Sequence, residues 1–391
     1  MKSGATTLKN TWKNSELVKR LPFSLSGSCD RLLLFTALSI AAFGLVMVYS
    51  ASYIFSQEKF GDGLYYFNRH LLFLGAGLAM MSFCRFLDYR VWQKLSLPIF
   101  LACIGLMMAV LVPGIGHKAG GARRWISLGG FTIQPVEFAK VGLLIFLSAR
   151  LSRKEMNFEK ISFRFLLELW PAVLMILLCL LEPDFGSSAL VLTITGVLVY
   201  LAGLRLRYLL GAVGAVLPLF AGLMILAPYR RARLLTYLNP WADPQGAGFQ
   251  IIQSFLAFYR GGLFGVGLGN SKAKIFYLPE AHNDFILSVV GEELGFLGIG
   301  LLILAFLFLL FRGVRVSAKC NDRFGALLAS GLTLMLGFEV FWNAAIVLGL
   351  FPNKGMNLPF ISSGGSSIIC AMTIMGILLN ISAQSKLERS A

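Results

Sequence analysis

The chain has 391 residues, of which 57% are hydrophobic and only 14% are charged, and its mean hydropathy is +0.74. A soluble protein of this length would fold as about two or three domains and carry more charge. The composition therefore excludes a soluble enzyme and predicts an integral membrane protein. The formal net charge of +16 is scattered through the segments between apolar stretches, so it favours lipid headgroups over nucleic acid as the anionic partner.

The predicted elements are all helices, because the apolar segments each approach the roughly 20 residues that span a bilayer. We expect an all-α, polytopic fold with about ten transmembrane helices and a large outer loop at 228–283, between the seventh and eighth. The ten apolar segments lie near residues 32–55, 70–87, 95–113, 135–151, 166–182, 186–203, 208–227, 285–311, 325–350 and 365–383.

The domain organisation follows from these segments. Residues 1–31 form a polar, basic N-terminal segment, residues 32–383 form one helix bundle, and residues 384–391 form a C-terminal tail. Most of the 35 basic residues fall on the side that holds both termini, which predicts that both termini are cytoplasmic. Four of the cysteines lie in apolar runs and none has metal-ligand spacing, so we interpret them as packing residues and predict no metal site.

Two positively charged residues and one aromatic residue follow the third apolar segment. Arg123 and Arg124 offer planar donors suited to a phosphate, and Trp125 offers a flat face at the membrane interface. The alternative is a simple membrane anchor, with an interfacial aromatic and cations that reach toward water.

Charged and amide side chains also fall inside apolar segments. Glu137 and Lys140 are three residues apart at the start of a helix, a spacing that predicts a buried ion pair. Glu339 and Asn343 are four apart and would share one helix face. Such residues are candidates for binding a substrate, although ion pairs and amides inside a membrane also serve only to join helices.

The large outer loop contains one more predicted helix. Ile251, Ile252, Phe255 and Phe258 recur at helical spacing, which predicts an amphipathic helix in the outer interface. We expect this loop to be mobile alone and to be ordered by a partner that docks on the outer side, and we expect substitutions at Phe255 or Phe258 on the apolar face to weaken activation more than they weaken folding. The glycine-rich run at 265–270 follows no strand, so it does not fit a dinucleotide fingerprint.

The stretch 277–293 carries the strongest catalytic candidates. Pro279 prevents a helix from continuing through it, and the next apolar run begins at Phe285. Asp284 therefore lies at a boundary between water and membrane, where a carboxylate can serve as a general base, with His282 beside it.

The segment that joins the last two apolar helices is rich in hydroxyls and glycine. Lys354 contributes a positive charge, and Ser362, Ser363 and Ser366 lie where backbone N–H groups at a helix start favour an anion. The alternative is helix capping and close packing of small residues.

Several motifs are distributed along the chain, at residues 121–126, 134–137, 182–186, 239–244, 277–286, 291–295 and 358–367. Together they resemble the SEDS family of FtsW and RodA proteins, and the residues around Asp284 are closer to the FtsW branch. The resemblance covers nearly the whole chain. Its departures are Val136, Asn283, Asn353 and Ser363, where the family usually has Ser, Thr, Thr and Tyr.

The resemblance implies a peptidoglycan glycosyltransferase that polymerises lipid II with inversion at the outer face of the bacterial inner membrane, at the division septum. It implies a class B penicillin-binding transpeptidase and other divisome or elongasome membrane proteins as partners. Asp284 would be the base, with His282 in support, and Arg123, Arg124 and Lys354 would hold pyrophosphate. The sequence does not fix whether a divalent cation, Mg²⁺ or Mn²⁺, takes part; such a cation would act by neutralising the leaving pyrophosphate.

Two other classes of function stay open at this point. A lipid II flippase would need a polar path across the membrane, which Glu137, Lys140, Glu339 and Asn343 would line. A non-catalytic scaffold would only recruit a transpeptidase, and it would have no need of an acid surrounded by cations. Conversion of lipid II to glycan strands by purified protein distinguishes both from the enzyme.

Overall fold

The computed structural model describes residues 29–390 except 120–121, 130, 154–162, 227–234, 247, 280 and 353–354. In this part of the chain, one apolar helix occupies each of the ten predicted membrane segments, which confirms the all-α, polytopic fold. These helices are α2 (Arg31–Phe60), α3 (Tyr65–Phe86), α5 (Ser96–Leu111), α6 (Pro135–Leu151), α8 (Trp170–Leu181), α9 (Phe185–Leu201), α10 (Leu206–Leu226), α13 (Ile286–Lys319), α14 (Arg323–Val347) and α15 (Gly365–Ser390).

Shorter elements complete the described chain. They are α4 (Tyr89–Lys94), β1 (Gly116–Ala119), β2 (Ala122–Leu128), β3 (Phe131–Ile133), α7 (Phe163–Glu168), the 3₁₀ turn η2 (Pro240–Ala242), α12 (Phe249–Gly261) and the π-helical turn η3 (Ala273–Tyr277). Within the described residues, four helices are individually long and apolar enough to cross a membrane, namely α2, α13, α14 and α15 through Leu387.

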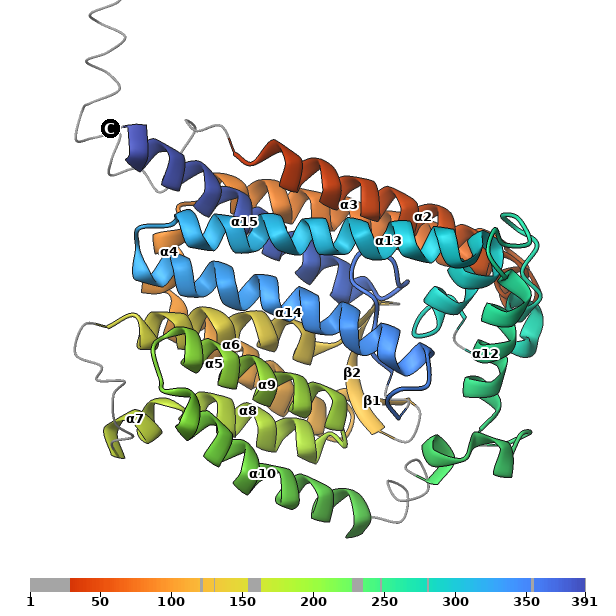
Figure 1. Cartoon of the computed structure of the whole chain (residues 1–391), viewed down its shortest axis with the longest axis horizontal. Helices are drawn as coiled ribbons and strands as arrows, with labels where there is room; N and C mark the ends of the chain where they lie inside the picture. Colours follow the sequence, from red (N-terminus) through yellow and green to blue (C-terminus); the bar gives the residue numbers. More distant parts are fainter. Residues whose placement is uncertain are drawn as a thin grey trace, which may run out of the picture.

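The helices lie side by side, and the bundle has two distinct ends (Figure 1). We call the end where α2 begins and α15 finishes the terminus end, and the end with β1–β3, α12 and residues 355–364 the loop end. Helix α15 lies at the centre of the bundle. In its apolar 18-residue stretch 83% of the residues are buried, whereas in that of α13 only 22% are buried. The face of α13 that remains exposed is available to lipid.

Helix α15 extends beyond the predicted limit of the bundle at residue 383. Its last turns keep Gln384 and Ser385 buried, so part of the predicted C-terminal tail is an extension of the central helix. The limits of the N-terminal segment stay a prediction, because residues 1–28 lie outside the described residues.

The segment after α5 folds as a small antiparallel sheet that we did not predict. In the described chain β2 pairs with β1 on one side and with β3 on the other, with Ile126 opposite both Gly116 and Ile133. The register shifts between His117 and Lys118, so that Arg124 is the extra residue between the paired Arg123 and Trp125. That Arg123 and Arg124 bind a phosphate stays a prediction.

The predicted amphipathic helix is confirmed as α12, and it is packed against the bundle. Ser254 Oγ lies 2.8 Å from Ser288 Oγ on α13 and donates to the Val347 carbonyl oxygen at 2.6 Å. The Phe255 and Phe258 rings press against the backbone of Gly349 and Gly291, which have no side chain in the way. These rings hold α12 against the bundle, and the effect of substitutions there on activation stays a prediction.

A break in α13 receives the glycine-rich loop that follows α12. Gly295 has φ 68° and ψ −167°, so the backbone leaves the helix at one residue. The amides of Val266 and Gly267 donate to the carbonyls of Glu292 and Glu293, each at 3.0 Å. The loop thus satisfies carbonyls that the broken helix would otherwise leave unpaired inside the membrane domain.

We predict that Gly295→Ala destabilises the protein by about 1–3 kcal/mol, because a β-carbon is strained at this positive φ. The added β-carbon would also lie 2.6 Å from the Leu263 carbonyl oxygen. Thermal unfolding of the purified protein measures the effect. Gly300→Ala is the matched control, since a β-carbon at Gly300 has open space around it in the same helix. Equal unfolding temperatures for the two variants would mean that the break carries no strain.

Candidate active site

The candidate site is built around Asp284, which lies at the loop end in the turn directly before α13. The preceding Leu278 and Ala281 and the following Phe285 are buried, and they anchor this turn in the core. Asp284 itself is partly exposed. The turn therefore presents a carboxylate at the surface of a rigid support, as a catalytic group requires.

Polar side chains from two other segments fix the backbone of this turn. Asn343 on α14 donates its amide to the Asp284 carbonyl oxygen at 2.9 Å and to the Met356 carbonyl oxygen at 2.5 Å. Ser362 Oγ donates to the Asn283 carbonyl oxygen at 2.7 Å, and the Ser363 amide donates to the His282 carbonyl oxygen at 3.1 Å. Residues 282–284 are consequently tied to α14 and to the segment 356–363.

The carboxylate of Asp284 lies over the backbone of Gly355. A β-carbon at Gly355 would be only 2.9 Å from Asp284 Oδ2, and this residue has φ 53°. Gly355 also lines a small cavity of about 20 Å³ together with Gln134 and the buried charges of α6 and α14. Gly355 therefore contacts the Asp284 carboxylate on one side and the cavity with the buried charged side chains on the other.

The interior below Asp284 contains a three-member charge cluster. Lys140 Nζ lies 2.8 Å from Glu137 Oε1 and 2.6 Å from Glu339 Oε1, and all three residues are buried. This confirms the predicted pair of Glu137 and Lys140 and adds Glu339 from α14. One cation between two carboxylates joins α6 to α14 and keeps the charges paired inside the membrane domain.

The hairpin between α8 and α9 lies beside the sheet. Arg124 donates its Nε to the Glu182 carbonyl oxygen at 3.2 Å and its Nη2 to the Pro183 carbonyl oxygen. Asp184 caps α9 by accepting from the Ser187 amide at 3.2 Å. Helices α8 and α9 are thus joined by a tight hairpin at residues 182–184, and Arg124 connects it to β2.

Comparison with known proteins now identifies the family. The sequence profile of the cell cycle proteins FtsW, RodA and SpoVE matches residues 30–387. The chain belongs to this family. A Geobacter metallireducens relative named as a probable peptidoglycan glycosyltransferase FtsW is 44% identical over 357 residues, which cover 91% of this chain and 95% of the relative. Stage V sporulation protein E of Bacillus subtilis is 41% identical over 361 residues, or 92% and 98% of the two chains.

Solved structures of the FtsW/RodA/SpoVE family have the same fold. A chain from a structure described as coordinating polymerization and crosslinking by a peptidoglycan synthase complex is 32% identical, with a TM-score of 0.76 over 91% of this chain and 98% of that one. RodA of Thermus thermophilus is 30% identical, with a TM-score of 0.68 over 91% and 97%. The resemblance to the SEDS family is thereby confirmed.

Other predicted site residues of this FtsW-like chain have structural contacts. The His282 ring lies 4.4 Å from the Tyr66 ring and 5.5 Å from the Phe55 ring, measured between centroids, so it belongs to an aromatic cluster on α2 and α3. Ser362 Oγ also accepts from the Leu358 amide at 2.8 Å, and Ser366 Oγ accepts from the Gln134 amide at 2.9 Å. Ser362 thus stabilises its own segment, and Ser366 joins the start of α15 to the start of α6.

The remaining candidates lie around the edge of the site. Arg123 is exposed on β2, and Trp125 is half-buried opposite His117 on β1. Lys354 lies outside the described residues, although its neighbour Gly355 faces Asp284. Asp284 and the pair of Glu137 and Lys140 are thus linked through Gly355, and Arg123 lies on β2 at the same loop end.

Sequence reasoning missed the ties that position the loop before Asp284. Glu292 Oε2 accepts from Ser271 Oγ at 2.5 Å and from the Ala273 amide at 3.0 Å. Glu293 Oε1 accepts from Lys274 Nζ at 3.0 Å and from Ser50 Oγ at 2.7 Å. The sequence did contain a signal for these contacts. Glu292 and Glu293 lie inside an apolar helix, where acidic side chains are expected to be paired.

The described residues contain no group of three or more His, Cys, Asp or Glu side chains that could hold a metal ion. A divalent cation at Asp284 would therefore need further oxygen ligands from a substrate, as Mg²⁺ commonly does with phosphates. One carboxylate at the surface fits that arrangement, so the predicted cation stays a proposal.

We predict that Lys140→Met lowers the unfolding free energy by about 3–5 kcal/mol, because it leaves two buried carboxylates without their cation. Unfolding of the detergent-purified protein measures the loss. The neutral triple variant Glu137→Gln, Lys140→Met, Glu339→Gln is the matched control and should recover most of the stability. A single variant as stable as the wild type would show that the cluster is not what joins α6 to α14.

A second prediction concerns pH. Burial raises the pKa of the Glu182 carboxyl from its ordinary 4.5 to about 8, the Asp184 carboxylate adds to the rise, and Arg124 opposes it. The folded state therefore keeps a proton that the unfolded state releases, so this contribution to stability is lost as the pH rises from 4.5 to about 8.

Glu182→Gln should make stability less dependent on pH between 4.5 and about 8. It should raise the unfolding temperature most near pH 8. Thermal unfolding across this pH range tests it, with the exposed Glu58→Gln as control. A slope that stays the same in Glu182→Gln would assign the pH dependence to another group.

Proposed function

We propose that the chain is a peptidoglycan glycosyltransferase that polymerises lipid II. One observation carries the proposal: Asp284 is held at the loop end by fixed backbone ties and faces Gly355, above the buried charge cluster. A general base must be fixed relative to the proton that it removes. The activity named for the FtsW relatives is consistent with that role.

The reaction assigns a task to this chain's residues. The acceptor 4-hydroxyl attacks the anomeric carbon of the donor, its proton passes to the Asp284 carboxylate, and the bond to undecaprenyl pyrophosphate breaks with inversion. The ties from Asn343 and Ser362 hold Asp284 still during this transfer. His282 supports the turn from within its aromatic cluster.

The leaving pyrophosphate needs positive charge. Arg123 is exposed on β2 with its fork available at the surface, and Lys354 precedes Gly355 in the sequence. Arg124 already donates to two carbonyls, so in our account it positions the sheet against the α8–α9 hairpin. A Mg²⁺ or Mn²⁺ ion would further neutralise pyrophosphate, and polymerisation with and without a chelator tests for it.

A flippase is less consistent with this interior. The cavity next to the buried cluster has a volume of about 20 Å³, which is comparable to one water molecule. The Lys140 ammonium is paired with two carboxylates and is not arranged along an open path. A scaffold would not explain the ties that converge on Asp284.

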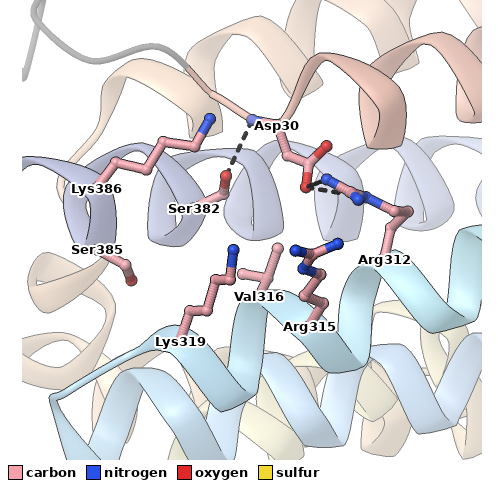
Figure 2. A pocket seen from close by; sticks show the side chains of 8 residues that line it. All are labelled: Asp30, Arg312, Arg315, Val316, Lys319, Ser382, Ser385 and Lys386. Carbon is pink, nitrogen blue, oxygen red and sulfur yellow. Dashed lines mark hydrogen bonds and ion pairs between the residues drawn. The ribbon is translucent and has the colours of Figure 1, made fainter.

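The charges of the chain support one orientation. Arg312 and Arg315 lie in the last turns of α13 (Figure 2), and Arg205 and Arg207 flank the first residue of α10, which begins at the terminus end (Figure 1). Basic residues accumulate on the cytoplasmic side of membrane proteins. We therefore infer that both termini are cytoplasmic and that the loop end faces outward in the inner membrane. Closer similarity to the FtsW relatives than to RodA favours the division septum.

We further propose a class B penicillin-binding transpeptidase as the partner, within a larger divisome or elongasome assembly. The description of the related complex couples polymerization to crosslinking, which is the transpeptidase reaction. Phe255 and Phe258 on α12 face the bundle. The partner would therefore contact the opposite, exposed side of α12 and the loop that follows it. Tyr259 and Phe264 are 84% and 77% exposed there.

For the catalytic role, we predict that Asp284→Asn lowers lipid II polymerisation by at least about 100-fold, because the amide cannot accept the proton. The assay uses the purified chain with its partner and follows glycan strands by gel. Asp62→Asn is the control, since Asp62 is exposed in the turn between α2 and α3. An Asn variant that folds and polymerises at the wild-type rate would remove Asp284 from the mechanism.

For the partner, we predict that the double variant Tyr259→Ala, Phe264→Ala lowers partner-stimulated polymerisation about tenfold while basal activity and unfolding temperature stay unchanged. Hydrogen exchange across residues 245–283, with and without the partner, locates the contact. Phe35→Ala with Tyr200→Ala removes two exposed aromatics elsewhere as a control. Unchanged stimulation in the loop variant would place the contact on another surface.

A further inference from the structure

The turn that joins α2 to α3 at the loop end carries a pair of stacked aromatic rings. The Phe60 ring at the end of α2 lies 4.1 Å from the Tyr65 ring at the start of α3, measured between centroids, and the two planes are inclined by 23°. Phe60 is 44% exposed and Tyr65 is partly exposed. The pair therefore presents aromatic surface outside the core, and we call it the aromatic platform.

Hydrogen bonds within the turn fix the platform. The Gly61 amide closes α2 by donating to the Gln57 carbonyl oxygen at 3.0 Å. The Gln57 side chain donates to the Gly61 carbonyl oxygen at 3.2 Å and accepts from the Gly63 amide at 2.9 Å. Because these bonds hold the backbone between the two rings, the platform has its shape before any ligand arrives.

The platform is continuous with the candidate active site. The Tyr66 ring lies 5.8 Å from the Phe60 ring and 4.4 Å from the His282 ring, measured between centroids. His282 precedes Asp284 by two residues in the same turn. Aromatic rings therefore lie side by side from the platform to the turn of the proposed base.

The platform is also tied to the small sheet. Arg69 on α3 donates its Nη1 to the Tyr65 hydroxyl oxygen at 3.5 Å and its Nη2 to Thr132 Oγ1 on β3 at 3.1 Å. The same guanidinium lies 5.8 Å from the centroid of the Phe131 ring, which is 40% exposed. The platform is thus in contact with the Asp284 turn through Tyr66 and with the sheet through Arg69.

The platform lies beyond the apolar part of α2. The apolar segment ends near residue 55, and at the rise of an α-helix Phe60 is roughly 7 Å further along the axis. The intervening Gln57, Glu58 and Lys59 are all exposed. Aromatic surface that is held among polar side chains, outside the core, is typical of a binding site.

A sugar ring is the ligand that fits this surface. One face of such a ring presents C–H groups with a partial positive charge, which pack on the negative face of an aromatic ring. Its hydroxyl and amide groups need hydrogen-bonding partners, and Asn68 is exposed about one helical turn after Tyr65. Lys59 Nζ lies 5.5 Å from the Phe60 ring centroid and adds a donor on the other side.

We propose that the aromatic platform, together with Asn68 and Lys59, binds a sugar ring of the growing glycan strand. This inference rests on the proposed polymerisation of lipid II at Asp284 and adds a site for the polysaccharide next to it. A strand that stays bound receives further units before it leaves. The platform would therefore increase the length of the strands that the chain makes.

Two measurements on the purified full chain test this proposal. The first is the length of the glycan strands made from lipid II with the partner, and the second is the affinity for lipid-free, uncrosslinked glycan strands. We expect the double variant Phe60→Ala, Tyr65→Ala to shorten the strands at least about threefold and to weaken binding about tenfold. Phe35→Ala with Tyr200→Ala removes two exposed aromatics elsewhere and should change neither quantity.

Two further variants keep the test decisive. Phe60→Tyr with Tyr65→Phe keeps both rings, so it should keep the strand length. Asn68→Ala changes one exposed side chain and should weaken binding about threefold, even if the double alanine variant folds poorly.

The outcomes separate this proposal from the proposed function. Wild-type strand length and wild-type glycan affinity in the double alanine variant would overturn the platform and leave the polymerase in place; the two rings would then be membrane anchors. A wild-type chain that binds glycan strands through Phe60 and Tyr65 but makes none from lipid II would support the platform and refute the polymerase.

Discussion

The amide of Asn343 is the interaction on which the geometry of the candidate site depends. It donates to the carbonyls of Asp284 and Met356, and so joins the turn before α13 to the segment after α14. Both acceptors are backbone atoms, whose positions side-chain rotation cannot change. A side chain in the middle of an apolar bundle has few alternative partners, so these bonds hold the two segments in one arrangement.

The same principle operates through the membrane domain. Several buried charges of the described bundle meet a partner of opposite sign or a backbone donor, as Lys140 does between two glutamates and Glu292 does at the Lys272 and Ala273 amides. Each such contact joins segments distant in sequence. The apolar surfaces place the helices in the bilayer. The polar contacts determine which segments lie next to each other at the loop end.

Hydropathy predicted the ten helices because each spanning segment must satisfy its own backbone and be apolar along its length. Spacing predicted the Glu137–Lys140 pair, since both residues lie on one helix. Glu339 could not be assigned to them, because its place depends on how α14 packs against α6. The sheet at 116–133 was also missed, since short strands are defined by partners that spacing does not reveal.

For Asp284, position at a helix start was predictable, while its ties to Asn343, Ser362 and Ser363 required the fold. Hydrogen exchange of residues 281–285 and 355–363 in Asn343→Ala measures those ties most directly. Our account predicts that both segments exchange faster together, while α12 and α6 keep their protection. Exchange at wild-type rates in both segments would contradict the claim that this amide holds the site.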